Sequence, residues 1–136
     1  MVNTPTSPKA KSKKTNKISR VVQKGRLYIT ATFNNTLASI TDDAGGVLCW
    51  TSTGEAGFSG SRKATPYAAT VTIENVLNKA RQFGLSELSV FIKGPGPARD
   101  VVLRVLRAQH IKLLALIDTT PDPHNGTRPR KAKHNK

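Results

Sequence analysis

Apolar and polar side chains alternate along residues 27–33, and this spacing predicts a strand with one buried face. The Asn-Asn pair at 34–35 and the run DDAGG at 42–46 are turn signals on either side of residues 36–41. We therefore expect strands at 27–33, 36–41 and 47–51, joined as an antiparallel meander. The first strand is expected to turn four side chains toward the core: Leu27, Ile29, Ala31 and Phe33.

After Thr65 the apolar residues recur every three or four positions, which predicts an amphipathic helix of about five turns. Thr65 is the expected N-cap, Pro66 the first helical residue and Gly84 the stop signal. The apolar positions of this helix are Ala69, Ile73, Val76, Ala80 and Phe83.

The rest of the chain predicts a strand, a helix and a last strand. Residues 85–92 form the strand, a Gly-Pro-Gly-Pro run at 94–97 ends it, and 98–109 has apolar residues on one helical face. Residues 111–117 (IKLLALI) are apolar enough to be a buried strand. The order βββαβαβ predicts an α/β fold, in which two helices pack against a mixed five-stranded sheet with parallel strands at each crossover.

Positive charge is concentrated at the two ends of the chain. Residues 1–26 hold eight Lys and Arg and residues 128–136 hold five, with no Asp or Glu in either range, although the whole chain carries a net charge of +14. We therefore divide the chain into a basic N-terminal tail (1–24), a globular domain (25–118) and a Pro-containing basic arm (119–136). Such tails are expected to stay disordered until they meet a polyanion. Nucleic acid suits them better than a membrane, because the N-terminal tail has no apolar face.

Ribonuclease H-like nucleases share this element order, so a metal-dependent nuclease is the alternative from a different class. Such an enzyme needs several carboxylates that converge at strand ends to hold two cations. The first predicted strand contains no Asp or Glu, the pair at 42–43 lies in a turn, and Glu74, Asp100 and Asp118 are isolated along the sequence. We therefore expect no catalytic residue, no metal site and no cofactor. A free-standing nucleic-acid chaperone or DNA-binding protein is a third possibility.

Two glycine-containing loops are candidate phosphate contacts. Residues 52–63 (STGEAGFSGSRK) lack the ending of a phosphate-binding P-loop. This segment is either a tight connection or a loop that presents hydroxyl and basic side chains to RNA. The run 94–99 combines the start of a helix with a positive side chain, which suits an anion, although Gly-Pro pairs also serve simply to turn the chain.

The remaining candidate groups favour structural roles. Cys49 lies in an apolar run without a nearby base, which predicts a small core residue in a reducing compartment. Trp50 and Phe58 could stack on bases or lie in the core. His110 has no Cys or His at metal-ligand spacing. No run approaches the length of a membrane-spanning helix, while the basic, Ser-containing start of the chain leaves a transit peptide open.

Four stretches and their spacing resemble one family closely. They are GPGPARD (94–100), IDTTPDPHNGTRPRK (117–131), FNNTLASITD (33–42) and GFSGSRKATPYAA (57–69). With them the chain resembles the family of the universal small-subunit ribosomal protein number eleven, bacterial type, over roughly residues 20–131.

This resemblance implies a ribonuclease H-like fold of the translational machinery component type, without catalytic function. It implies a structural constituent of the small ribosomal subunit that binds 16S ribosomal RNA on the platform, bridges RNA helices and helps to form the cleft near the messenger RNA exit. Neighbouring small-subunit proteins seven and eighteen are implied partners, with no membrane, and the implied location is the cytoplasm, in the ribosome.

The resemblance also assigns candidate RNA contacts to the Asn-Asn turn, the loop before the first helix, the Gly-Pro-Gly-Pro loop and the C-terminal arm. Asp118 and Asp122 are unsuited to phosphate, so we expect them to cap the backbone or to pair with a cation. The candidate RNA-binding residues are Asn34, Asn35, Thr36, Ser59, Ser61, Arg62, Lys63, Lys93, Arg99, His124, Asn125, Arg128, Arg130 and Lys131.

Two positions depart from the family pattern, which usually has glycine at both. Ala98 narrows the backbone conformations open to the start of the second helix. His110 must either adopt the positive φ of a C-cap or end the helix in another way.

Overall fold

The structure, a computed structural model, describes residues 21–132 of the chain. The predicted order of strands and α-helices is confirmed, and a short 3-10 helix that the sequence did not predict precedes the first α-helix. Positions 1–20, which were expected to belong to a disordered tail, lie outside the described residues. The elements are β1 (Lys24–Ala31), β2 (Thr36–Asp42), β3 (Val47–Ser52), η1 (Gly60–Ala64), α1 (Pro66–Arg81), β4 (Glu87–Lys93), α2 (Ala98–Ala108) and β5 (Lys112–Asp118).

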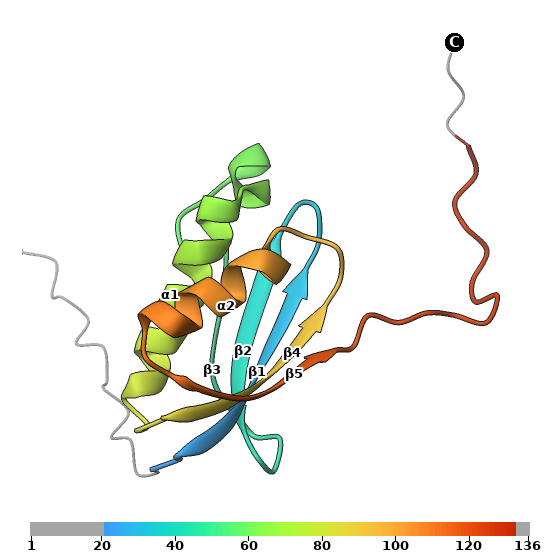
Figure 1. The fold of residues 1–136 in the computed structure, drawn as a ribbon. Helices are drawn as coiled ribbons and strands as arrows, with labels where there is room; N and C mark the ends of the chain where they lie inside the picture. Colours follow the sequence, from blue (N-terminus) through green and yellow to red (C-terminus); the bar gives the residue numbers. More distant parts are fainter. Residues whose placement is uncertain (1–20, 133–136) are drawn as a thin grey trace, which may run out of the picture.

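The five strands form one mixed sheet in the order β3-β2-β1-β4-β5. β1 pairs with β2 and β2 with β3 in antiparallel fashion, as the predicted meander requires, whereas β4 is parallel to both β1 and β5. Both α-helices cover the same face of the sheet, α1 over β2 and β3 and α2 over β1 (Figure 1). The carboxyl ends of β1, β3, β4 and β5 consequently lie along one edge of the sheet.

The hydrophobic core lies between the sheet and the two helices. Leu27, Ile29 and Ala31 point from β1 toward the helices and are buried, as the alternation predicts. Full burial of each large aliphatic side chain contributes roughly 1.5–3 kcal/mol. The predicted apolar face of α1 is also buried at Ala69, Ile73, Val76 and Ala80.

The prediction that Phe33 faces the core is wrong. β1 ends at Ala31, and Phe33 lies in the following turn with 72% of its surface exposed. The backbone N–H of Thr32 donates to the carbonyl oxygen of Asn35 at 2.9 Å, and the Thr32 hydroxyl donates to the same oxygen. These hydrogen bonds turn the chain at Thr32, so β1 ends before Phe33 although the alternation of apolar and polar residues continues to Phe33.

The start of α1 matches the sequence prediction, whereas the helix ends at Arg81, before Phe83, which was predicted to be one of its apolar positions. Thr65 is the N-cap, with its Oγ1 accepting a hydrogen bond from the Ala68 N–H at 3.2 Å, and Pro66 is the first helical residue. Gly84 follows the end of the helix with a φ of 76°, a left-handed conformation that glycine adopts without a steric penalty. Phe83 lies beyond the last helical residue and is half-buried.

The two positions that depart from the family pattern lie at opposite ends of α2. Ala98 is its first residue and is fully buried. His110 follows its last turn with a φ of 57°. His110 therefore adopts the positive φ of a C-cap and does not end the helix in another way. Glycine would be less strained in this conformation.

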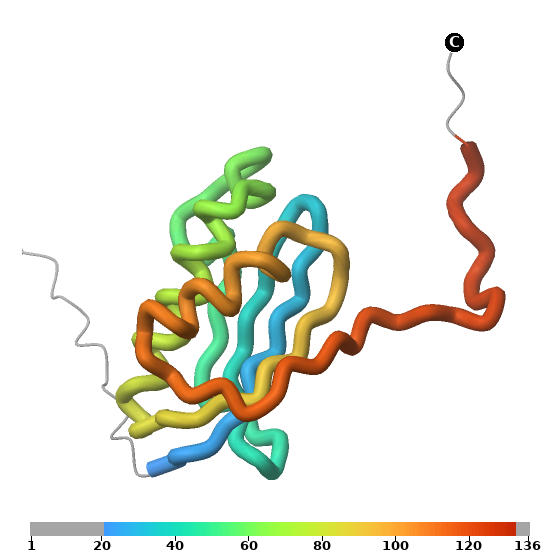
Figure 2. The backbone as a smooth tube through the Cα atoms, viewed as in Figure 1, coloured from blue at the N-terminus to red at the C-terminus, as the bar shows by residue number. Residues whose placement is uncertain are grey.

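The prediction that 111–117 is a buried strand is wrong. β5 is an edge strand that pairs only with β4 among the described elements, and Leu116 and Ile117 are 46% and 41% exposed. The chain trace shows why: the helices pack over β1, β2 and β3 and do not extend over β5 at the edge of the sheet (Figure 2). Apolar composition alone does not distinguish a central strand from an uncovered edge.

Candidate nucleic-acid interface

The predicted contact segments meet along one edge of the sheet. The β1–β2 turn (32–35), the loop after β3 with η1 (53–64), the Gly-Pro-Gly-Pro loop (94–97) and the start of the arm (118–120) all follow or join strand ends at that edge (Figure 1). We call these four segments together the loop edge. The sequence predicted the segments separately, and only the strand order brings them together.

Hydrogen bonds connect the first two segments of the loop edge. The Thr53 N–H donates to the carbonyl oxygen of Thr36 at 3.1 Å, and the Thr53 hydroxyl donates to Asn35 Oδ1. Asn35 Oδ1 also accepts from the Thr36 N–H at 2.9 Å. Of the three candidate residues here, Thr36 is fully buried, Asn35 is half-buried and Asn34 is exposed. Of the three, Asn34 is therefore the residue most accessible to a ligand.

The loop before α1 presents its candidate residues outward. Ser59, Ser61 and Arg62 are exposed, and Lys63 is half-buried. The Thr65 hydroxyl donates to the carbonyl oxygen of Arg62 at 2.9 Å, which joins η1 to the N-cap of α1. Polar and basic side chains therefore surround a helix N-terminus whose dipole favours anions, although Pro66 has no N–H and Thr65 Oγ1 already accepts from the Ala68 N–H.

The Gly-Pro-Gly-Pro loop packs directly on the end of β1. The Gly96 N–H donates to the carbonyl oxygen of Ala31 at 2.9 Å. A Cβ atom on Gly94 would lie 2.2 Å from that oxygen, and one on Gly96 would lie 2.4 Å from the carbonyl oxygen of Thr32. Both positions require glycine because the two backbones approach too closely for any side chain.

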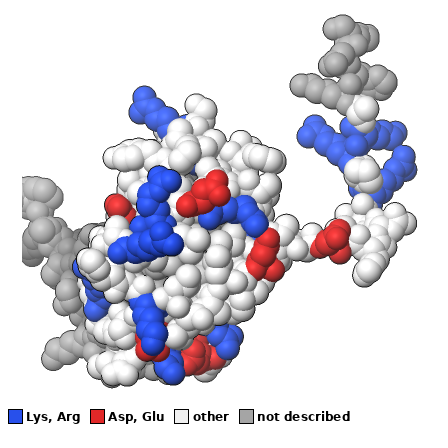
Figure 3. Space-filling model, viewed as in Figure 1, with Lys and Arg blue, Asp and Glu red and all other residues white. Residues whose placement is uncertain are grey.

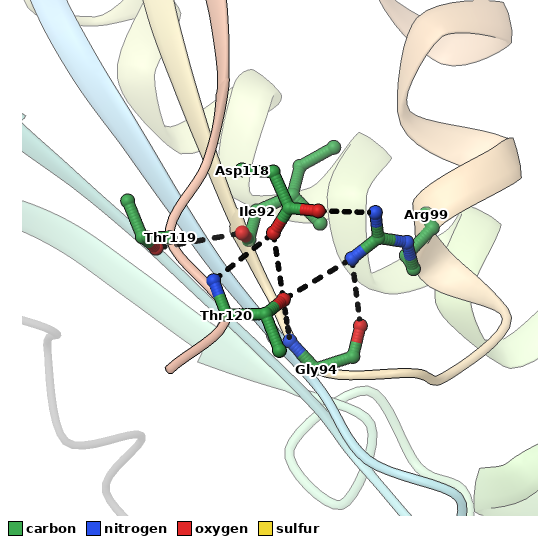
Figure 4. Close-up of polar contacts among 6 residues, drawn as sticks. All are labelled: Ile92, Gly94, Arg99, Asp118, Thr119 and Thr120. Carbon is green, nitrogen blue, oxygen red and sulfur yellow. Dashed lines mark hydrogen bonds and ion pairs between the residues drawn. The ribbon is translucent and has the colours of Figure 1, made fainter. Parts of the chain in front are cut away.

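An ion pair holds the base of the arm against this loop. Arg99 Nη2 donates to Asp118 Oδ2 at 2.7 Å, while Nη1 donates to the carbonyl oxygen of Gly94 at 3.1 Å and to Thr120 Oγ1 at 3.3 Å (Figure 4). The expectation that Asp118 pairs with a cation is thereby confirmed. Arg99, a candidate RNA contact, already makes three hydrogen bonds within the chain.

The same carboxylate organises the backbone of the arm. Asp118 Oδ1 accepts from the Thr120 N–H at 3.0 Å and from the Thr120 hydroxyl at 2.6 Å, and Thr120 Oγ1 accepts from the Gly94 N–H at 3.1 Å. The Thr119 N–H donates to the carbonyl oxygen of Ile92 at 2.8 Å. Hydrogen bonds from Arg99 and then from Thr120 hold the pKa of Asp118 well below its usual range. We call Gly94, Arg99, Asp118, Thr119 and Thr120 the arm clasp.

Beyond the arm clasp the chain leaves the body. The described arm residues after Thr120, up to 132, are exposed and make no hydrogen bond or ion pair with the rest of the described chain. Asn125 and Gly126 have φ values of 92° and 46°, as expected for a turn. Basic side chains gather on the outer part of the arm (Figure 3), where the candidates Arg128, Arg130 and Lys131 lie.

Two acidic side chains near the loop edge are neutralised by partners, whereas Asp100 in the first turn of α2 is exposed and forms no ion pair with the described residues. Glu55 pairs with Lys79 at 2.6 Å, and this hydrogen bond is the main cause of the lowered pKa of Glu55. Asp118 is paired with Arg99 as described above. Arg62 and Lys63 have no ion-pair partner among the described residues, and Lys93 is exposed at the end of β4. The free charge of the loop edge is therefore positive.

Other candidate groups lie elsewhere in the structure. Cys49 packs against the core, its thiol donates to the carbonyl oxygen of Val76 at 3.7 Å, and burial raises its pKa to about 11. Within residues 21–132, no three His, Cys, Asp or Glu side chains are grouped as a metal site would require. None of the helices in the same range has both the length and the apolar composition needed to cross a membrane.

Replacing Asp118 with asparagine is expected to loosen the arm without unfolding the body. The amide cannot form the ion pair with Arg99, and the exposed position makes a large change in Tm unexpected. Heteronuclear NOE values at Thr119 and Thr120 should fall in Asp118→Asn and stay unchanged in the control Asp122→Asn. Because the pKa of Asp118 is lowered by folding, wild-type ordering should persist at all pH values above the unfolded carboxyl value of about 4, and weaken as the pH falls toward the lowered value. Equal NOE values in both variants would contradict the role of the ion pair.

The chain is similar to known ribosomal proteins along most of its length. A family model described as "Ribosomal protein S11" matches residues 25–134. Three curated relatives share the name "Small ribosomal subunit protein uS11". The one from Nautilia profundicola is 45% identical over 92% of this chain and 97% of its own length, and the one from Ruthia magnifica is 47% identical over 98% of both. The relative from Vesicomyosocius okutanii is 48% identical over 91% of this chain and 97% of its own.

Proposed function

Because the chain belongs to the ribosomal protein S11 family, we propose that it binds 16S ribosomal RNA on the platform of the small subunit, bridging RNA helices near the messenger RNA exit. Members of this family are structural, non-enzymatic constituents of the small ribosomal subunit in the cytoplasm, and ribosomal RNA and other ribosomal proteins are their partners. Small-subunit proteins seven and eighteen are the specific neighbours that we propose.

The convergence of four polar or basic segments on the loop edge is the observation that supports this function most strongly. Arg62 and Lys63 flank the N-terminus of α1, and Lys93 lies at the carboxyl end of β4 on the same edge. These cations replace the counterions of RNA phosphates, while Asn34 and the serines of η1 add hydrogen bonds that set the orientation. A duplex is recognised here through its backbone and shape.

The arm supplies the second contact that bridging requires. The arm clasp fixes where the arm leaves the body, and the outer residues carry charge away from the loop edge. His124, Asn125, Arg128, Arg130 and Lys131 then reach a second RNA segment. Pro121 and Pro123 restrict the free arm, so less entropy is lost when it docks than for a glycine-rich arm.

Hydroxyl-radical footprinting of 16S ribosomal RNA in reconstituted small subunits tests the proposal. We expect the full chain to protect two separate sets of nucleotides on the platform. Removing residues 124–136 should abolish one set and leave the other, whereas Arg62→Ala with Lys63→Ala should weaken the set that the truncation retains. Protection outside the platform, or a single set lost in both variants, would overturn the bridging arrangement.

A further inference from the structure

One face of the sheet is left uncovered by the described part of the chain. In β1 the buried residues Leu27 and Ile29 point toward the helices, so Tyr28, which lies between them, points to the opposite side. The same alternation in β4 buries Val90 and places Phe91 opposite. Because α1 and α2 both pack on the buried side, this second side is open, and we call it the open face.

A row of five side chains, four of them large, crosses the open face at right angles to the strands, with Ser39 between Trp50 and Tyr28. Tyr28 is paired with Phe91 on one side and with Ser39 on the other, Ser39 is paired with Trp50, and Phe91 is paired with Ile117. The five residues therefore lie next to one another on all five strands. The rings of Tyr28 and Phe91 are stacked, with centroids 4.9 Å apart and planes 14° from parallel.

The ends of this row are accessible to solvent. Trp50 is 58% exposed, and Ile117 is 41% exposed. Tyr28 and Phe91 in the centre are half-buried by their neighbours within the sheet. The sequence left open whether Trp50 stacks on bases or lies in the core, and its exposure excludes the core.

Basic side chains flank the row on the same face. Arg26 lies two residues before Tyr28 on β1, where the side chain of Tyr28 raises the pKa of Arg26, while Lys93 lies two residues after Phe91 on β4. The one acidic side chain that β4 adds, Glu87, lies between Lys24 at 4.0 Å and Lys112 at 3.8 Å. Asp43 is a second acidic group, close enough to act on Arg26, so the described charges around the row are four cations (Lys24, Arg26, Lys93 and Lys112) against two carboxylates, a positive sum.

We propose that the open face binds unpaired RNA nucleotides, whose bases stack on the exposed ring of Trp50 and pack against the stacked pair of Tyr28 and Phe91 while the flanking cations contact the phosphates. This proposal rests on the proposed function, because it gives the ribosomal RNA a second kind of contact. Aromatic rings in a positively charged sheet suit unstacked bases, whose faces are available, and do not suit a duplex, whose bases are already stacked. An apolar protein segment is the less suitable occupant, since it would bury Arg26 and Lys93 without compensating their charge.

Fluorescence of the tryptophan tests this directly, because Trp50 is the only tryptophan in the chain. Titration of the full chain with a short unstructured single-stranded RNA should quench its emission saturably, and a blunt RNA duplex should bind without quenching. Phe91→Leu removes one ring but keeps an apolar side chain. This variant should bind the single strand about five- to hundredfold more weakly and the duplex unchanged, as expected for the loss of one base–ring contact.

Phe83→Leu is the matched control, because it makes the same change at a half-buried ring beyond the end of α1, away from the open face. Cooperative thermal unfolding of both variants establishes that they fold. Equal affinities of the two variants for the single strand, without quenching of Trp50, would overturn the proposal while leaving duplex binding and the proposed function intact. If ribosomal proteins shield Trp50 from solvent and RNA does not, the open face binds a protein. That result would also overturn the proposal that it binds RNA. Failure to bind either RNA would contradict the proposed function itself.

Discussion

Replacement of Gly94 by alanine is expected to destabilise the fold by roughly 3 kcal/mol or more, one of the largest single-residue effects in this chain. Gly94 has a φ of 96°, and a Cβ atom there would lie 2.2 Å from the carbonyl oxygen of Ala31. That oxygen belongs to the backbone and accepts the hydrogen bond of Gly96, so it cannot move without opening the loop edge. Chemical denaturation of the purified variant measures the loss.

Gly45 provides a matched control for this prediction. It has a φ of 94°, nearly the same as that of Gly94, but a Cβ atom there would meet nothing within 4 Å. Gly45→Ala should therefore cost only the left-handed conformation, about 1–2 kcal/mol. If the two variants lose the same stability, the close approach of the Gly-Pro-Gly-Pro loop to β1 is not what requires glycine at Gly94.

Removal of residues 124–136 is expected to leave the body folded and to weaken RNA binding by at least about tenfold at moderate salt. The described part of the removed segment makes no hydrogen bond with the body, and the whole segment holds five Lys and Arg and no acidic residue. Thermal unfolding should remain cooperative, with little change in Tm. Filter binding to a platform fragment of 16S ribosomal RNA measures the affinity.

A full-length variant separates charge from chain length in this experiment. Substitution of Arg128, Arg130 and Lys131 by glutamine keeps the arm but removes its described cations, and should reproduce most of the loss in affinity. An unchanged affinity would show that the arm contributes through something other than charge. Loss of cooperative unfolding in the truncated chain would show that the arm is part of the fold.

Local patterns were sufficient to predict the strands and α-helices of this fold, but not the 3-10 helix η1. The alternation at Leu27, Ile29 and Ala31 marks β1, and Thr65-Pro66 marks the start of α1, because strand faces and helix caps depend on neighbouring residues. The errors arise where distant residues decide the outcome. Phe33 continues the alternation but follows a turn, and the apolar residues of β5 are not covered because α2 lies over β1.

The candidate site shows the same division. Individual residues of the loops and the arm could be chosen from residue type and resemblance, but their convergence depends on strand order. The ion pair between Arg99 and Asp118 joins residues 19 positions apart. They meet because α2 connects β4 to the parallel neighbouring strand β5, so the start of α2 and the end of β5 lie at the same edge of the sheet. The row on the open face depends on the register of five strands, so the sequence could not distinguish a stacking Trp50 from a core residue.

The salt dependence of RNA affinity tests most directly the claim that free cations at the loop edge and on the arm neutralise RNA phosphates. The full chain is titrated with a platform fragment of 16S ribosomal RNA at several salt concentrations. If about six Lys and Arg side chains contact phosphates, the affinity should fall by roughly 10³ between 50 and 200 mM salt. An affinity that does not change over this range would contradict the account.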